Sequence, residues 1–152
     1  MDFLRLIPYN NTRKRKIYLC GSEMKKYEKI LEPVLRKHSW VAAAFILGSA
    51  ARDALRPESD IDLALLPLPD YRPTPFDCTE LAVEIESILS RTIDLGVLTT
   101  DNIVYAKEAY LSGHCVYSQN DFYRDLFGAT ILGLYAKLRE ERKEIENAYR
   151  ID

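Results

Sequence analysis

Two aspartates separated by one residue, with a Gly-Ser pair ahead of them, are the side chains of this sequence best suited to chemistry. The stretch 45–65 reads FILGSAARDALRPESDIDLAL, so Gly48 and Ser49 end one apolar run, and Asp60 and Asp62 begin another. Side chains two apart on a strand share a face, which places the two carboxylates side by side. Such a pair is costly unless a cation compensates it, and Mg²⁺ prefers oxygen ligands and often brings substrate phosphates. A Gly-Ser turn leading into a helix attracts phosphate. The pattern predicts a metal–nucleotide site.

Two further residues are candidates for the same site. Asp94 lies in the middle of the apolar run TIDLGVL, where the alternative is a capping or paired carboxylate. Arg52 lies one turn into the helix expected after Ser49, where its guanidinium can bind a phosphate oxygen; the alternative is a simple ion pair with Asp53 or Glu58. His38 and His114 have no partners at ligand or catalytic spacing, so we expect surface or edge positions for them.

The order Gly-Ser, ten residues, Asp-x-Asp, in the local form GSAAR…SDIDLAL, resembles the nucleotidyltransferase superfamily related to DNA polymerase β. The length is similar to that of its smallest members, the minimal nucleotidyltransferases (MNT), which are often encoded beside a HEPN-domain protein as a toxin–antitoxin pair. The resemblance covers roughly residues 22–135. It implies an α/β (α+β) fold with a small mixed sheet of about four strands flanked by helices.

The resemblance also implies roles for the candidate residues. Asp60, Asp62 and Asp94 would be the catalytic carboxylates and would hold two Mg²⁺ ions, Asp94 matching by position the third acidic residue of the family. Gly48, Ser49 and Arg52 would bind the triphosphate of ATP. The implied reaction is transfer of AMP to a tyrosine of a HEPN ribonuclease toxin, which makes that toxin the expected partner in a hetero-oligomer.

Two other functions remain open at this point. One is a nucleotidyltransferase that acts on a small molecule such as an antibiotic, although such enzymes carry a larger C-terminal helical domain than residues 100–152 provide. The other is a non-catalytic antitoxin that neutralises its partner by binding alone. Three clustered carboxylates argue against the second, because a pure binding module has no need of them.

Composition limits the classes of protein to consider. The chain has 152 residues, of which 47% are hydrophobic, enough for one domain with a single core. Its net charge of −2 gives no general attraction to nucleic acid, so no direct nucleic-acid binding is expected. The three cysteines, Cys20, Cys78 and Cys115, lack metal-binding spacing and are expected to be idle thiols. No apolar stretch approaches the roughly 18 residues of a membrane span, and no signal peptide is evident, so we expect a cytoplasmic protein.

The hydrophobic pattern predicts an N-terminal arm over 1–21, with the basic cluster Arg13–Lys16, followed by one domain over 22–152. Strands are expected over 41–47, 61–66 and 92–98, with an edge strand over 114–117. Helices are expected over 22–38, between Ser49 and Pro57, after Thr74, over 103–112 and, as a long helix, from about Asn120. Ser22, Thr74 and either Asp101 or Asn102 are the expected N-caps, Pro33 is expected to kink or restart the first helix, and Gly113 is expected to end the helix over 103–112.

Apolar stripes on these helices identify the faces expected to be buried. The stripes are Met24, Tyr27, Leu31, Val34 and Leu35 on the first helix, Leu81, Ile85, Ile88 and Leu89 on the helix after Thr74, and Ile131, Leu134, Tyr135, Leu138, Ile145 and Tyr149 on the last. Trp40 is expected in the core. The last stripe runs beyond the surface that the core can cover, so the final turns either end in solvent or bind a partner.

Overall fold

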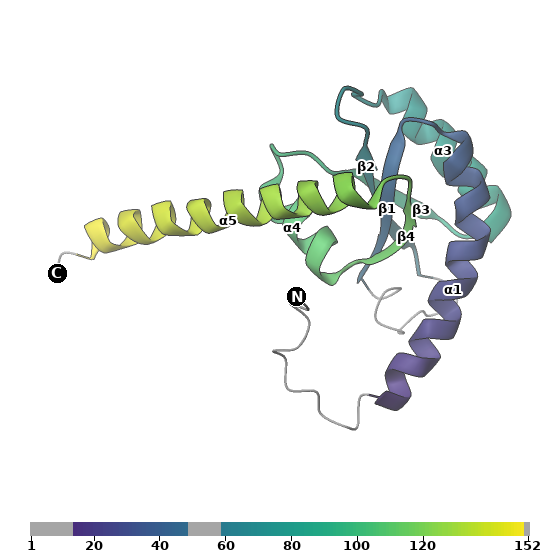
Figure 1. The fold of residues 1–152 in the computed structure, drawn as a ribbon, viewed down its shortest axis with the longest axis horizontal. Coiled ribbons are helices and arrows are strands. Elements are labelled where there is room, and N and C mark those ends of the chain that lie inside the picture. Colours follow the sequence, from purple (N-terminus) through teal and green to yellow (C-terminus); the bar gives the residue numbers. More distant parts are fainter. Residues whose placement is uncertain (1–13, 49–58, 151–152) are drawn as a thin grey trace.

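A computed structural model describes residues 14–48 and 59–150 of the chain. Its centre is a four-stranded mixed sheet with strand order β3-β2-β1-β4 (Figure 1). The strands are β1 (Val41–Leu47), β2 (Ile61–Pro67), β3 (Ile93–Val97) and β4 (His114–Ser118). β1 pairs antiparallel with both β2 and β4, whereas β2 and β3 run parallel. The strands expected at 41–47, 61–66, 92–98 and 114–117 are therefore all present, and the mixed four-stranded sheet is confirmed.

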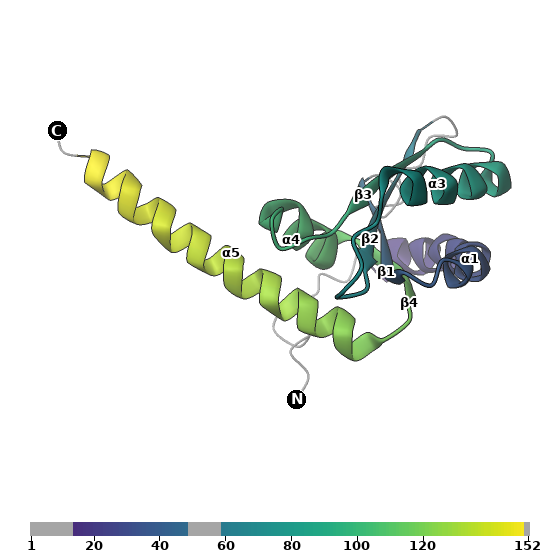
Figure 2. The ribbon, with the colours of Figure 1, turned by 90° about the horizontal axis from the view of Figure 1, so that it is seen from above.

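Helices cover both faces of the sheet (Figure 2). The helices α1 (Lys14–Lys37) and α3 (Pro75–Leu89) pack on one face, and α4 (Ile103–Ser112) and the first part of α5 (Asp121–Tyr149) pack on the other. Because side chains alternate along β1 and β2, the sheet contributes to two separate apolar clusters, one beneath each pair of helices. Trp40 belongs to the cluster under α1 and α3 and is buried, as expected.

The first helix differs from its prediction at the N-terminal end. α1 begins at Lys14, so Ser22 lies inside it and is not its N-cap, and the helix continues without a restart through Pro33. The predicted apolar stripe is correct, since Met24, Leu31, Val34 and Leu35 are buried and Tyr27 packs against them. Residues 1–13 lie outside the described part of the chain.

The helix α3 begins where the sequence predicts. The Thr74 hydroxyl accepts a hydrogen bond from the backbone N–H of Asp77, and the Asp77 carboxylate accepts one from the backbone N–H of Thr74, which together form a capping box. Leu81 and Ile85 are buried, but Ile88 is 49% exposed, so its assignment to the buried stripe is wrong.

Gly113 ends α4 as predicted, for a packing reason. Its backbone is extended, with φ −75° and ψ 157°, so it does not occupy the left-handed conformation typical of a glycine cap. A Cβ atom there would lie 2.3 Å from the Ala109 carbonyl oxygen and 2.7 Å from a methyl carbon of Leu47. Glycine is required because α4 and β1 approach closely at this point. Asn102 is the N-cap of α4 but makes no capping hydrogen bond through its side chain.

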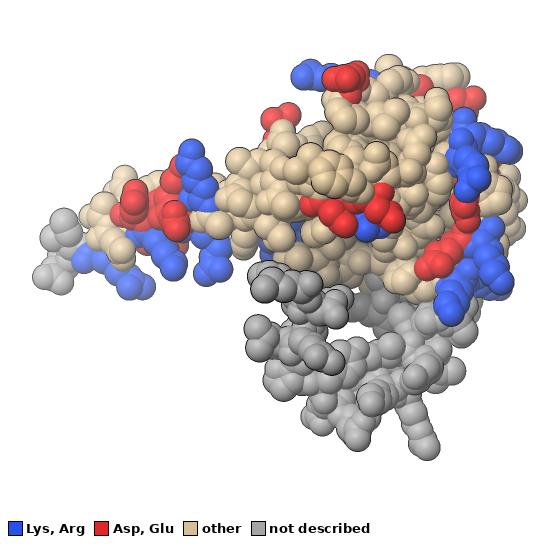
Figure 3. All heavy atoms as spheres, in the orientation of Figure 1, with Lys and Arg blue, Asp and Glu red and all other residues tan. Residues whose placement is uncertain are grey.

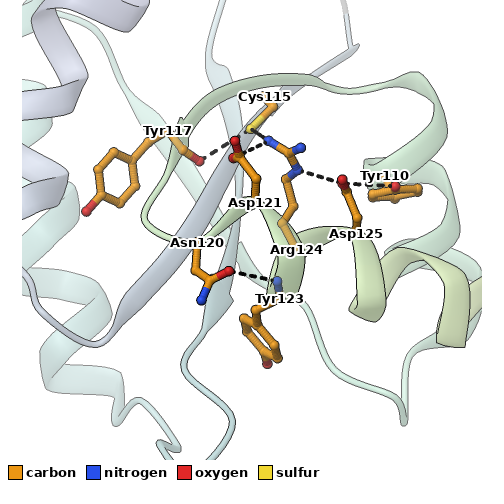
Figure 4. A network of polar contacts seen from close by, with 8 residues as sticks. All are labelled: Tyr110, Cys115, Tyr117, Asn120, Asp121, Tyr123, Arg124 and Asp125. Atoms are coloured by element: carbon orange, nitrogen blue, oxygen red, sulfur yellow. Dashed lines mark hydrogen bonds and ion pairs between the residues drawn. The ribbon is translucent and has the colours of Figure 1, made fainter.

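The last helix is fastened at its first turns and projects beyond the sheet at its other end (Figure 1). The side-chain oxygen of Asn120 caps it by accepting from the backbone N–H of Tyr123. The Arg124 guanidinium binds Asp121 and Asp125, and the Tyr110 hydroxyl of α4 donates to Asp125 (Figure 4). This network holds the start of α5 against α4.

The buried stripe of α5 stops before the helix does. Ile131 is buried and the stripe residues up to Leu138 are half-buried, whereas Ile145 and Tyr149 are 57% and 86% exposed. The final turns therefore extend past the core, as both sequence-based alternatives require.

Candidate active site

The start of β2 brings two of the predicted carboxylates next to each other across the sheet. Asp62 is the second residue of β2 and pairs in register with Asp94 of the parallel strand β3 and with Leu47 at the end of β1. Neighbouring strands lie about 4.8 Å apart, so both aspartates, which are exposed, project from adjacent positions on the sheet. Asp60 directly precedes β2 and is also exposed.

The carboxylates influence one another. Partial burial raises the pKa of Asp62 above its ordinary value, and the negative charges of Asp94 and Asp60 raise it further. A cation at this position would reverse that effect, because it favours the charged form of all three groups. The local electrostatics are therefore those of a site that gains free energy by binding a cation.

Gly48 lies beside this pair at the point where β1 ends. Its φ is +66°, a conformation that residues with a side chain rarely adopt, and a Cβ atom there would lie 3.0 Å from Oδ2 of Asp62. Glycine thus leaves the backbone bare directly against the carboxylate. A phosphate group can approach a bare backbone more closely than one that carries a side chain.

The three aspartates fit Mg²⁺ by their chemistry, although their oxygen atoms do not already converge. Among residues 14–48 and 59–150, no three His, Cys, Asp or Glu side chains form a ready-made metal-binding group. Like charges favour rotamers that keep the carboxylates apart, and aspartate side chains on adjacent strands need only rotate to share one cation. The hard oxygen donors and the bare backbone at Gly48 are what a magnesium-bound triphosphate requires.

A cleft of about 450 Å³ opens in front of the carboxylate pair. Asp62, Asp94 and Gly96 form its floor on the sheet, and Asn102 and Tyr105 line it from the start of α4. Burial raises the pKa of Tyr105, and the charges of Asp94 and then Asp62 raise it further, so the hydroxyl stays protonated and can donate a hydrogen bond.

Arg91 positions the segment that leads into β2. Its guanidinium donates to the carbonyl oxygen of Ser59 at 2.8 Å, and the backbone N–H of Ile61 donates to the carbonyl oxygen of Thr92 at 3.0 Å. Both contacts join the residues flanking Asp60 to the segment that precedes Asp94. These contacts fix the segment before β2, and with it Asp60, next to the start of β3.

The structure brings four of the predicted residues together and places three others beside them. Asp60, Asp62, Asp94 and Gly48 lie together, whereas Ser49 and Arg52, and the short helix expected to end at Pro57, fall outside the described residues. The sequence reasoning did not identify Arg91, Gly96 or Tyr105. A glycine inside a strand signals close approach of another group, so Gly96 in TIDLGVL was the one available clue to Tyr105.

The other candidates do not belong to this site. His38 pairs with Glu84 and His114, at the edge strand, pairs with Glu28. Cys78 and Cys115 are half-buried free thiols whose pKa values are raised chiefly by burial, as expected of idle cysteines. No helix in the described part of the chain is long and apolar enough to cross a membrane.

Comparison with known families identifies the class of protein. The model of the family "Polymerase beta, Nucleotidyltransferase" matches residues 28–122. This range includes β1, β2 and β3 together with Gly48, Asp60, Asp62 and Asp94. The chain belongs to this nucleotidyltransferase family. No curated protein matches the sequence.

Three of the similar solved structures are of toxin–antitoxin complexes. A chain in a crystal structure of a toxin–antitoxin with AMP-PNP is 23% identical, with a TM-score of 0.68, and the match covers 80% of this chain and 97% of that one. A chain in the structure of the tri-AMPylated Shewanella oneidensis HEPN toxin in complex with MNT antitoxin is 22% identical, with a TM-score of 0.64 and coverage of 83% and 98%. A chain of the MntA–HepT toxin–antitoxin is 21% identical, with a TM-score of 0.59 and coverage of 85% and 97%.

Proposed function

We propose that this protein is a magnesium-dependent antitoxin that transfers AMP from ATP to a tyrosine of a HEPN ribonuclease toxin. The observation that carries the proposal is the in-register pair of Asp62 and Asp94 beside the bare backbone of Gly48, in a chain of the nucleotidyltransferase family. The fold neighbours support it, because one is a toxin–antitoxin with AMP-PNP and another contains a tri-AMPylated HEPN toxin.

The residues of the site have the following roles in this proposal. Asp60 and Asp62 would hold two Mg²⁺ ions, and Asp94 would complete the coordination of one of them. Bound there, magnesium supplies charge neutralisation at the phosphoryl oxygens and lowers the pKa of the attacking hydroxyl. Asp94 would accept the proton of that hydroxyl. Gly48, together with Ser49 and Arg52, would bind the β- and γ-phosphates.

The transfer of AMP needs no reactant other than ATP and the acceptor tyrosine. The tyrosine oxygen of the acceptor forms a bond to the α-phosphorus of ATP, the bond from that phosphorus to the bridging oxygen breaks, and pyrophosphate leaves. The proton of the tyrosine passes to a carboxylate. The protein contributes mainly by positioning the two reactants and by stabilising developing charge.

Removal of divalent metal tests the proposed chemistry directly. A chelator should abolish transfer of AMP to a cognate HEPN protein, and Mg²⁺ or Mn²⁺ in excess should restore it, because three bare carboxylates repel a triphosphate. The measurement is the mass of the HEPN protein after incubation with ATP. Full transfer in the presence of chelator would contradict the magnesium assignment.

Truncation of α5 tests where the toxin binds. The projecting turns carry charges of both signs (Figure 3) together with the exposed side chains of Ile145 and Tyr149. Deletion of 139–152 should raise the KM for the toxin about tenfold or more, because burial of one side chain such as Ile145 contributes about 1.5–3 kcal/mol. The dissociation constant for ATP should stay within about twofold. Ile145→Ser combined with Tyr149→Ser should reproduce the loss, whereas the matched Lys143→Ser should not. An equal loss of toxin binding and of ATP binding would show that the projecting turns are not a separate surface for the toxin.

A further inference from the structure

Tyr105 is held in an unusual position over the sheet. A Cβ atom at Gly96 would lie 2.0 Å from the Tyr105 hydroxyl oxygen and 2.6 Å from Cζ of its ring, so the ring rests directly on the bare backbone of β3. Gly96 is two residues beyond Asp94 on the same strand, and the two residues share one face. The pair of Gly96 and Tyr105 therefore forms a wall of the cleft next to Asp94.

This wall and Gly48, the proposed phosphate-binding residue, lie on opposite sides of the carboxylates. Across the sheet, Gly48 follows β1, Asp62 is on β2 and Asp94 is on β3, which is an edge strand. A triphosphate bound at Gly48 would occupy the β1 side. The acceptor hydroxyl must then reach the α-phosphorus from the β3 side, where Tyr105 lies.

The surroundings of Tyr105 have room for a polypeptide. A second hollow of about 510 Å³ adjoins the cleft at Val97 and is lined by Arg72, Tyr123 and Phe127 among others. Both hollows lie over the apolar cluster that α4 and α5 cover, so they open on the same face of the sheet. An acceptor side chain in the cleft would leave space for its neighbouring residues in this hollow.

We infer that Tyr105 is an acceptor-binding residue, and that its ring, held over Gly96, is the surface on which the acceptor tyrosine of a protein substrate packs beside Asp94. The inference rests on the proposed function and adds to it the subsite that selects an aromatic acceptor. Two aromatic rings in edge or offset contact stabilise each other beyond simple burial.

The test separates binding of acceptor from binding of nucleotide. Tyr105→Leu keeps apolar packing and removes the aromatic ring, so it should raise the KM for the HEPN protein about 3- to 10-fold, corresponding to the loss of one aromatic pair. Tyr105→Phe should stay within about twofold of the wild type in KM. The dissociation constant of Mg–ATP, measured by calorimetry without the acceptor, should change less than twofold in both variants.

A second variant tests the same geometry from the sheet. Gly96→Ala places a methyl group against the Tyr105 ring and should raise the acceptor KM to a similar extent, and it should add little when combined with Tyr105→Leu because the obstructing ring is then absent. Phe76→Leu, which changes an exposed aromatic residue of α3 on the opposite face of the sheet, is the matched control and should leave the acceptor KM unchanged.

The outcomes distinguish this inference from the function on which it rests. An unchanged acceptor KM in Tyr105→Leu, or an equal loss of Mg–ATP affinity, would overturn the acceptor role of Tyr105 while leaving nucleotide transfer intact. A wild-type protein that binds Mg–ATP and the HEPN protein but transfers nothing would overturn the proposed function and this inference with it.

Discussion

Asp62→Asn should abolish AMP transfer and leave the protein folded. The substitution removes one carboxylate from the pair with Asp94 and with it a negative charge that Mg²⁺ requires. A metal ion contributes several kcal/mol of transition-state stabilisation, so we expect kcat to fall at least about 1,000-fold. The measurement is the initial rate of AMP incorporation, with the exposed Asp70→Asn as the matched control.

Stability should respond in the opposite direction to activity. Because the pKa of Asp62 is raised in the folded protein, its ionised form opposes folding above that pKa, and this effect disappears as the pH falls below the ordinary value of an aspartate. The neutral asparagine side chain of the variant removes the repulsion, so the melting temperature without metal at pH 7 should be equal to or higher than that of the wild type. Retained transfer in Asp62→Asn would remove this residue from the site.

Gly48→Val should prevent productive binding of the nucleotide. The backbone at Gly48 has φ +66°, which costs an ordinary residue roughly 1–2 kcal/mol, and the new side chain begins 3.0 Å from an oxygen of Asp62. A β-branched residue there would occupy the space that a phosphate needs and press on the carboxylate. We expect transfer to fall at least about 100-fold, in the range for losing a phosphate-binding backbone donor.

The control for this variant is a glycine with free space around it. A Cβ atom at Gly133 of α5 would meet nothing within 4 Å, so Gly133→Ala should leave transfer unchanged and stabilise the helix by up to about 1 kcal/mol. Calorimetric titration with Mg–ATP measures the nucleotide affinity of both variants. Wild-type affinity in Gly48→Val would show that this turn has only a structural role.

The sheet and the carboxylate pair could be predicted because their signals are local. Asp62 and Asp94 each lie in an apolar run that favours a strand, and the family resemblance matched Asp94 by position to the third acidic residue of the family. Thr74 and Asp77 likewise form their capping box within four residues of sequence. The start of α1 could not be predicted in the same way, because Ser22 has the character of a cap although the helix in fact begins at Lys14.

The contacts that the sequence did not reveal join distant residues. Tyr105 lies over Gly96 only because α4 crosses the sheet at that point, and no periodicity in the sequence specifies the crossing. The contacts of Arg91 with Ser59 depend in the same way on the pairing of β2 with β3. Gly96, a glycine inside a strand, was the one sign of such a contact in the sequence. Only the three-dimensional structure identified Tyr105 as the residue that contacts it.

The most direct measurement distinguishes an antitoxin that acts as an enzyme from one that only binds its toxin. A cognate HEPN protein is incubated with ATP, Mg²⁺ and about one-hundredth of an equivalent of this protein, and its mass and ribonuclease activity are followed. If the protein is an enzyme, the entire HEPN population should gain AMP and lose ribonuclease activity, and Asp60→Asn should stop both changes because it removes one of the metal-binding carboxylates. Neutralisation that requires about one equivalent of antitoxin, adds no mass to the HEPN protein and survives Asp60→Asn would contradict the proposed enzyme.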